Sequence, residues 1–342
     1  TPVFILYMNG IRLSADLEAS VQEVVVHEVL NDISSFKISI SDPDGKWLDH
    51  RDISMGSKIT VLMGYKDMVI EMLSGEITSI NAYFGKSIKA DIVLTGSDFL
   101  HKCDRGYKVQ AFNNKSGSDI LNKIANDGGG NIFANGVSTV KPFHLQKEVT
   151  DIQVMRNFAE CAGAGFITRL GKVSFSPLSN MSSLIPVILE YGKTLLEFES
   201  FKESRGLNCS VDYRGWNCKD YTLIQKNLGP SNLTTKIGGS TAGSEKTSNA
   251  FGTYESVKTD FTVKDESETE TRAETFLNTE SMEYLYARGK CQGNIALHGG
   301  NTIIIKEVGD DYSGSYIVLS AKHRLVPMKG YTVEFEAARN CI

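Results

Sequence analysis

The stretch SGSYIVLSAKHRLVPMKGYTVEFEAAR, residues 313–339, contains two runs in which apolar and polar side chains alternate. Alternation with a period of two is typical of strands that bury one face and expose the other. The first run follows Ser313-Gly314, and the second begins at Tyr331, directly after Lys329-Gly330. The C-terminal part of the chain, from Asn301 onward, is therefore predicted to be β.

A similar arrangement occurs near the N-terminus. Ser74-Gly75 precedes a strand, a loop and the alternating run Ile88–Thr95, just as Ser313-Gly314 precedes Tyr331–Ala337. Coincidence between two short patterns is one explanation, and two similar β-barrels in one chain is the other. We take the second as the hypothesis. Three copies of such a chain around a threefold axis would form a ring of six similar units.

The rest of the chain divides by composition and pattern into four predicted regions. The fold class is mainly β, with two antiparallel β-barrels and a small α/β insert. A stretch rich in Gly, Ser, Thr and Asn at 229–256 is predicted to be a flexible loop. The predicted regions are 1–105, the first barrel; 106–190, the insert with two helices; 191–228 with 300–342, the second barrel; and 229–299, a flexible loop and helix excursion.

Helices are predicted at three places. One spans Ser116–Asp127 and stops at the glycines that follow it, and a second spans 150–163. Thr150 and Gln153 have the spacing of a capping box at the start of this second helix. A third helix is predicted over Ser267–Ala287. A hairpin is expected to turn at Leu170-Gly171-Lys172.

Composition excludes several classes of protein. The 342 residues are 41% hydrophobic and 23% charged, which is ordinary for a globular protein and rules out collagen-like, coiled-coil and fully disordered chains. The net charge of −5 argues against a protein whose main task is to grip phosphate backbones. No apolar run is long enough for a membrane helix. The six cysteines form no C-x-x-C pair, so we expect reduced, mostly buried thiols and synthesis in the cytoplasm.

Chemical motifs are weak throughout the sequence. The Gly128–Gly130 run lacks the Lys-Ser/Thr of a phosphate loop, and no H-E-x-x-H or G-x-S-x-G pattern occurs. The paired acids Asp42/Asp44 and Asp310/Asp311 lie in predicted turns, where Asp is a common turn former. We therefore expect no catalytic residue, no cofactor, no metal site and no enzymatic activity.

The motifs of the C-terminal strands and of several upstream segments resemble the phage late-control gene D family. Its members are baseplate hub proteins of contractile-tailed phages and the N-terminal part of VgrG proteins of type VI secretion and related injection systems. The resemblance spans most of the chain. It rests on Ser313-Gly314-x-Tyr316-x-Val318, Ala321-Lys322-His323, Lys329-Gly330-Tyr331-x-x-x-Phe335-x-x-x-Arg339, Gly96-Ser-Asp98-Phe-Leu100 and Tyr213-Arg-Gly215-Trp216-Asn217, where Asn replaces the family's Asp.

The resemblance implies two tube-protein-like barrels per chain and a trimeric, pseudo-sixfold ring around a central channel. Such a hub is a structural virion or injection-particle component that joins a hexameric inner tube to a trimeric spike. The implied partners are two further copies, the tube protein, a spike protein or fused spike domain, and other baseplate proteins, with nucleic acid or effectors only as passing cargo. Structural or interface roles are expected for Gly75, Gly96, Asp98, Trp216, Gly314, Tyr316, His323, Gly330, Tyr331 and Phe335.

Several alternatives remain open at this stage. One is a cell-wall hydrolase used in penetration, and another is a monomeric surface β-sandwich that serves adhesion. Many family members continue into a spike, whereas this sequence stops soon after Arg339. Either the spike is a separate polypeptide or the sequence is cut short. Phage tail, secretion apparatus and extracellular injection particle are equally compatible with the sequence.

Overall fold

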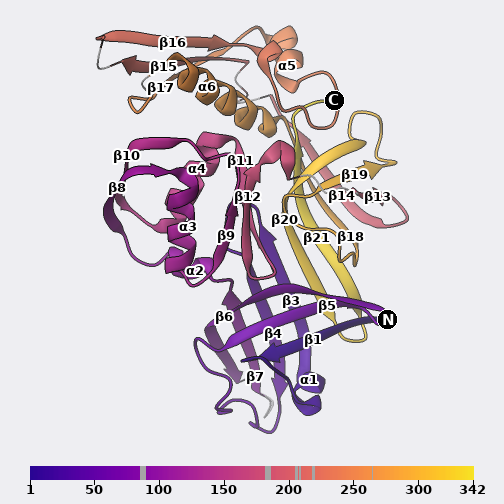
Figure 1. The fold of residues 1–342 in the computed structure, drawn as a ribbon. Helices are drawn as coiled ribbons and strands as arrows, with labels where there is room; N and C mark the ends of the chain where they lie inside the picture. Colours follow the sequence, from indigo (N-terminus) through magenta and orange to yellow (C-terminus); the bar gives the residue numbers. More distant parts are fainter. Residues whose placement is uncertain (85–89, 182–185, 205–206, 208, 218–219, 264) are drawn as a thin grey trace.

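The computed structural model describes the chain from residue 1 to 342 except for residues 85–89, 182–185, 205–206, 208, 218–219 and 264. Its dominant feature is one sheet of 13 strands, which is accompanied by three small sheets and a few helices. The predicted fold class, mainly β, is confirmed. Figure 1 shows the N-terminal strands at one end of the molecule and the helices of residues 243–281 at the other.

The first half of the large sheet comes from the N-terminal hundred residues. Its strands lie in the order β3-β4-β7-β6-β5-β1-β2, and every neighbouring pair is antiparallel. The elements are β1 (Pro2–Met8), β2 (Ile11–Arg12), α1 (Ala15–Ser20), β3 (Val21–Val29), β4 (Ser35–Asp42), β5 (Lys58–Tyr65), β6 (Met68–Phe84) and β7 (Ala90–Ser97).

The second half of the sheet comes mainly from the C-terminus. Its strands lie in the order β14-β18-β21-β20, and β19 and β13 continue from β20. The elements are β13 (Val187–Glu190), β14 (Leu195–Lys202), β18 (Leu285–Gln292), β19 (Thr302–Lys306), β20 (Gly314–Val326) and β21 (Gly330–Arg339).

The two halves repeat the same strand topology. In chain order, β1, β3, β4, β5, β6 and β7 correspond to β13, β14, β18, β19, β20 and β21, and each strand has the corresponding neighbours. The one difference is that β1 runs antiparallel to β5, whereas β13 runs parallel to β19. The repeat that we inferred from the Ser-Gly segments is therefore present in the strand pairing.

The repeat extends to the irregularities of the strands. Pairing of β6 with β7 shifts between Ile77 and Ser79, and pairing of β20 with β21 shifts between Val318 and Ser320. A second shift, in β3 against β4, recurs in β14 against β18. The backbone N–H of Ile77 donates to Ser57 as that of Val318 donates to Asn301. Bulges fix the register of a strand, so the two halves correspond residue by residue.

This correspondence differs by two residues from the one that the sequence suggested. With Ile77 equivalent to Val318, the residue equivalent to Gly314 is Leu73 rather than Gly75. A shift of two residues keeps every side chain on its own face of the sheet. The sequence therefore predicted the correct strands and faces. The exact register between the two halves is set by the bulges, which the sequence does not show.

The insert lies between the two halves in the chain. Its predicted helices are confirmed: Ser116 forms a capping box with Asp119, the Thr150 hydroxyl accepts from the N–H of Gln153, and the second helix ends at Gly163 with φ of 57°. The Leu170–Gly171 hairpin turn is also confirmed. The elements are α2 (Leu100–Cys103), β8 (Lys108–Ser116), α3 (Gly117–Asp127), β9 (Asn131–Ala134), β10 (Val140–Val149), α4 (Asp151–Ala162), β11 (Ala164–Arg169), β12 (Lys172–Pro177) and η1 (Leu178–Asn180).

A further unit follows β14 and packs its sheet against a long helix. The elements are β15 (Ser210–Asn217), β16 (Thr222–Leu228), η2 (Pro230–Asn232), α5 (Gly243–Phe251), β17 (Glu255–Thr259), α6 (Glu266–Ser281) and η3 (Met282–Tyr284). Strands β16, β15 and β17 form a separate sheet. The predicted place of β15 and β16 in the second barrel is therefore wrong, because the apolar face of this sheet packs on α6 instead.

Two other expectations for this region are corrected. The segment 229–256 is not wholly an unpacked loop, because it contains α5, buries Leu233 and Ala242, and sets Gly243 directly against the ring of Tyr284. The third helix ends at Ser281, and Leu285 begins β18 in the large sheet. Local composition did not reveal either packing, since both depend on partners distant in the chain. The domain limits themselves remain a prediction.

Candidate functional site: the seam between the two halves

The two halves of the large sheet meet where β3 pairs with β20. Six residue pairs form this seam, from Val29 opposite Ser320 to Val24 opposite Leu325. One hydrophobic core extends across it and includes strands of both halves. Figure 1 shows β3 and β20 side by side along the middle of the molecule. The seam therefore holds the two repeats at a fixed angle.

A buried polar cluster lies on the core side of the seam. Glu28 of β3 is fully buried, and its carboxylate lies 3.0 Å from Nδ1 of His298 in the loop before β19. The backbone N–H of Gly299 also donates to this carboxylate. The ring of His323 of β20 lies 5.9 Å from that of His298, with Nδ1 2.6 Å from the Tyr331 hydroxyl and Nε2 2.8 Å from the Leu297 carbonyl.

Hydrogen bonding determines the protonation of His323. A carbonyl oxygen only accepts, so Nε2 carries the proton and Nδ1 accepts from the Tyr331 hydroxyl. Burial lowers the pKa of His323 to about 4, which keeps the ring neutral. Burial would raise the pKa of Glu28, but the hydrogen bond and charge of His298 outweigh it, so its pKa is lowered. Within the cluster, the Glu28 carboxylate is therefore paired with the imidazole of His298.

Glu28, His298 and His323 also have ligand atoms within 4.8 Å of one another, as a metal site requires. Both nitrogens of His323 are already used, however, by Tyr331 and the Leu297 carbonyl. A metal would have to displace one of these buried hydrogen bonds. The donor set therefore fits a hydrogen-bonded lock between strands better than a metal site.

The insert is tied to the same place. The Arg169 guanidinium of β11 donates to the Gly299 carbonyl and to Oδ1 of Asn301, both at 2.8 Å. Asp98, at the end of β7, is buried and accepts from the backbone N–H groups of Ser34 and Leu100. Burial raises the pKa of Asp98 to about 6. Both contacts fix the insert to the sheet beside the seam.

Four further predicted residues have packing roles. A Cβ on Gly75 would lie 2.2 Å from the Ser97 carbonyl, and one on Gly96 would lie 2.2 Å from the ring of Phe36. Phe335 fills the space above Gly289, where a Cβ would lie 2.4 Å from its ring. Gly330, the first residue of β21, has a conformational role instead, because its φ of 116° is one that few other residues tolerate.

Gly314 and Tyr316 surround a buried arginine. The Arg339 guanidinium lies 4.7 Å from the ring centre of Tyr316 and donates to the carbonyls of Ser313 and Asp311. A Cβ on Gly314 would meet Nη1 of Arg339 at 2.5 Å. Burial raises the pKa of Tyr316 to about 12. The sequence placed Arg339 in the motif, but nothing in it indicated that the side chain is buried.

Trp216 is apart from the other predicted residues. It lies on β15 opposite Leu223, in the separate sheet, and is 37% exposed. A barrel-core position for Trp216 does not fit this place in the fold, and an interface role stays a prediction. Among the ten predicted residues, the structure brings together His323 with Tyr331 and Gly314 with Tyr316 through Arg339.

The face of the sheet that points away from the core is polar. Along one row of cross-strand neighbours, Glu197, Lys290, Glu334 and Lys322 follow one another with alternating charge. Ion pairs join Lys322 to Glu334, and Glu23 to both Arg324 and Lys37. Over the second half this face forms a shallow groove of about 490 Å³. The sequence pattern could not predict this alternation of acidic and basic side chains, because the alternation depends on the order of the strands in the sheet.

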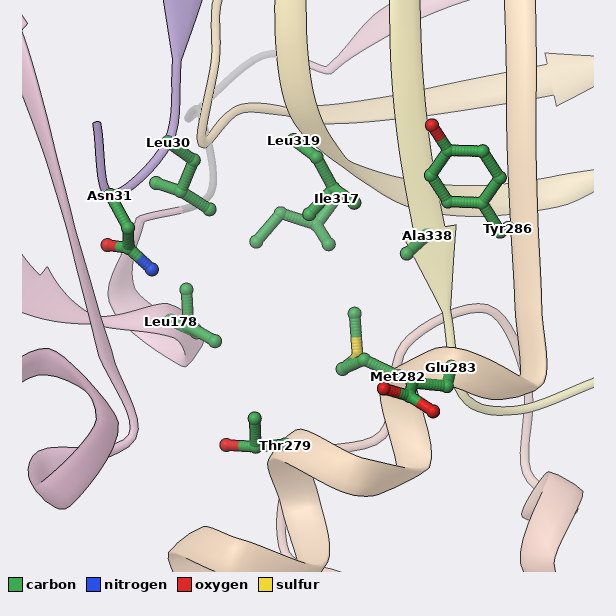
Figure 2. A pocket seen from close by; sticks show the side chains of 10 residues that line it. All are labelled: Leu30, Asn31, Leu178, Thr279, Met282, Glu283, Tyr286, Ile317, Leu319 and Ala338. Carbon is green, nitrogen blue, oxygen red and sulfur yellow. The ribbon is translucent and has the colours of Figure 1, made fainter. Parts of the chain in front are cut away.

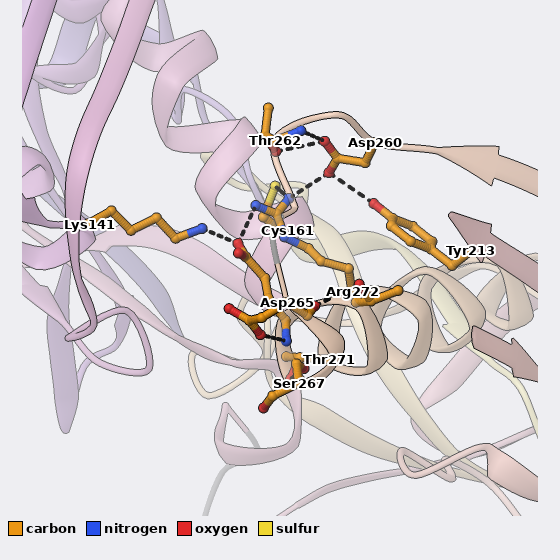
Figure 3. A network of polar contacts seen from close by, with 11 residues as sticks. Lys141, Cys161, Tyr213, Asp260, Thr262, Asp265, Ser267, Thr271 and Arg272 are labelled. Carbon is orange, nitrogen blue, oxygen red and sulfur yellow. Dashed lines mark hydrogen bonds and ion pairs between the residues drawn. The ribbon is translucent and has the colours of Figure 1, made fainter. Parts of the chain in front are cut away.

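Two junctions join the insert to neighbouring parts of the fold. Figure 2 shows an apolar hollow of about 340 Å³ between the sheet, the insert and η3, lined among others by Leu178, Met282 and Ile317. Lys141 of the insert pairs with Glu268 of α6. Figure 3 shows the polar network around this pair, in which Arg272 of α6 contacts Cys161 of α4. These contacts join the insert to the α6 unit.

Comparison with solved structures places the fold among phage tail and secretion proteins. The 43 kDa tail protein of prophage MuSo2 from Shewanella oneidensis has a TM-score of 0.75 at 11% identity, covering 99% of this chain and 98% of that one. The tail protein from Neisseria meningitidis MC58 has a TM-score of 0.73 at 11% identity, with 99% and 96% covered.

The Escherichia coli c3393 protein, a component of the type VI secretion system described as similar to the T4 tail proteins gp27 and gp5, has a TM-score of 0.59 at 11% identity, with 98% and 76% covered. The family model described as the Alg8 N-terminal domain matches residues 2–326, and the chain belongs to that family. No curated protein matches the sequence. Among the described residues, no helix is long and apolar enough to cross a membrane.

Proposed function

We propose that this chain is the central hub of a contractile tail or injection machine. Three copies would form a pseudo-sixfold ring that joins a hexameric inner tube to a trimeric spike. The observation that carries the proposal is the repeat of a six-strand topology within one chain, matched to the positions of its bulges. Three chains with two similar repeats each would present six similar surfaces to the hexameric tube. The same assembly would present three identical surfaces to the trimeric spike.

The resemblance to the late-control gene D family, and to the N-terminal part of VgrG, supports the same function. So does the likeness of the fold to tail proteins and to a type VI secretion component. In this proposal the work of the protein is geometric, and it has no enzymatic activity. Its partners are the tube protein, a spike protein or spike domain, and other baseplate proteins, and it is assembled into a particle.

The polar face of the large sheet would line the central channel. Acidic and basic side chains alternate along its cross-strand rows, with Glu334 paired to Lys322 and Glu336 paired to Arg288. A lining of paired charges binds neither polyanions nor polycations strongly, because each charge already has a partner. Cargo of either sign would therefore pass without being held.

Electron microscopy of the purified chain at high concentration tests the proposal. We expect end-on views of rings with threefold symmetry, six similar lobes and a central hole. Single particles that persist at every concentration, alone and with an added spike partner, would contradict the hub. A turbidity assay on isolated cell walls tests the absence of a hydrolase, and clearing of the suspension would contradict that part.

A further inference from the structure

We infer that the outer edge of β14 pairs with the C-terminal part of β6 of a second copy, in the register of the seam between β3 and β20. The inference rests on the proposed ring and names the surfaces that close it. Because β14 corresponds to β3 and β6 corresponds to β20, the seam inside the chain is a template for the contact between chains.

Both edges are open in the single chain. β14 is the last strand of its half and pairs along its length only with β18 among the described residues. β6 pairs with β5 up to Glu76, and a turn bonds Ile77, but the same edge from Ser79 to Phe84 has no strand partner in the described part of the chain. The equivalent edge of β20 is the one that β3 covers. Open edges are templates for strand addition.

The register follows from the bulges. The position of Ser320 corresponds to Ser79, and that of Leu325 corresponds to Phe84. On the other strand, Val24 corresponds to Phe198. The seam pairs Leu325 with Val24, so Phe84 of one copy should lie opposite Phe198 of the next. The remaining pairs run from there to Ser79 opposite Glu203.

Side-chain exposure supports this pairing. Leu325 is 2% exposed and Val24 is fully buried, because each strand of the seam covers the other. Phe84, which occupies the position equivalent to Leu325, is 67% exposed. A large apolar side chain at a core position of the repeat, without a strand to cover it, indicates that the covering strand comes from elsewhere.

Charge is compatible with the same register. Lys202 would lie opposite Ile80, Glu199 opposite Tyr83, and Phe201 opposite Asn81, so no like charges meet across the strands. The buried cluster of the seam inside the chain is not repeated here, since Lys202 replaces Glu28 and Ala82 replaces His323. The contact between copies would be more apolar than the seam within each copy.

Paired cysteines test the register. Asn81→Cys combined with Phe201→Cys places two thiols directly opposite each other, at a separation that a disulfide can span. Mild oxidation should give covalent trimers on a non-reducing denaturing gel, and each single variant should not. Tyr83→Cys with Phe201→Cys is the matched control, because those positions would be diagonal neighbours and too far apart.

A second variant tests the surface itself. Phe84→Ser should abolish the ring in electron microscopy and leave the unfolding transition of the monomer unchanged, since the side chain is exposed in the single chain. Phe261→Ser, at a site 77% exposed on another part of the molecule, should keep the ring.

The outcomes separate this inference from the proposed function. Three results would overturn the inferred pairing and leave the hub intact. Rings could form but cross-link through Tyr83→Cys instead of Asn81→Cys, they could form without cross-linking through either cysteine, or they could survive Phe84→Ser. An absence of rings from the unmodified chain, together with no cross-linking by any pair, would overturn both.

Discussion

The hydroxyl of Tyr331 donates a hydrogen bond of 2.6 Å to Nδ1 of His323, and both groups are buried at the seam. Tyr331→Phe removes the donor and leaves Nδ1 without a partner. A buried unsatisfied acceptor costs about 1–3 kcal/mol, so the free energy of unfolding should fall by that amount in urea titrations. Tyr221→Phe, at an exposed tyrosine, is the control and should change little. Equal effects of the two variants would contradict the role of the pair.

The low pKa of His323 predicts a loss of stability in acid. Its pKa is about 4 in the folded chain, against an ordinary value of 6.5 for a solvated histidine. Between these values the unfolded chain binds the proton and the folded chain does not, so stability falls as pH drops from 6.5 to 4. The full effect is on the order of 3 kcal/mol at about 1.36 kcal/mol per pH unit.

Comparison with His323→Gln isolates this effect. Gln can donate to the Leu297 carbonyl and accept from Tyr331 without titrating. Asp98 acts in the opposite direction, because its raised pKa, about 6, favours folding as the pH drops below that value. As the pH falls from 6.5 to 4, wild type should therefore lose stability relative to His323→Gln, while the contribution of Asp98 is the same in both. A difference independent of pH would exclude the assignment.

The fit of Phe335 over Gly289 predicts a coupled pair of substitutions. Gly289→Ala places a methyl group against the Phe335 ring and should destabilise by about 1–3 kcal/mol. In the first half the equivalent pair is Ile38 opposite Leu94. Gly289→Ala should therefore cost less in a Phe335→Leu background. Additive effects in the double-mutant cycle, measured by urea unfolding, would show that the two residues do not share this space.

Arg339 predicts a large effect from a change that keeps volume. Arg339→Met retains much of the side chain but removes the donors to the Ser313 and Asp311 carbonyls. Hydrogen bonds to charged groups contribute about 1.5–3 kcal/mol each, so thermal unfolding should move to lower temperature. Arg105→Met, at an exposed arginine, provides the comparison. A transition unchanged from wild type would mean that desolvation cancels these bonds.

Local signals in the sequence predicted the elements better than their partners. The glycine stop after Asp127, the cap at Thr150 and the turn at Leu170-Gly171 act within a few residues, so they could be predicted from the sequence. The separate sheet that contains Trp216 could not, because its strands have the same alternation as those of the large sheet. Pairing between distant strands is decided by faces and register, which a single sequence shows only in part.

The same limit applies to the candidate site. His323 and Tyr331 were singled out by their motif, and they contact each other. Glu28 and His298 were not, because their role depends on the contact between a strand and a loop 270 residues apart. The edges of β6 and β14 that have no strand partner in the described part of the chain depend on strand order, which the sequence does not show.

The covalent link between the two halves has a kinetic consequence. The seam between β3 and β20 joins segments of one polypeptide, so its formation is independent of protein concentration. A contact between separate chains depends on concentration and competes with translational entropy. Six separate units would need five bimolecular steps to assemble, whereas three chains that each contain two fused repeats need two. Such a ring would close from few pieces, each with its internal angle already set.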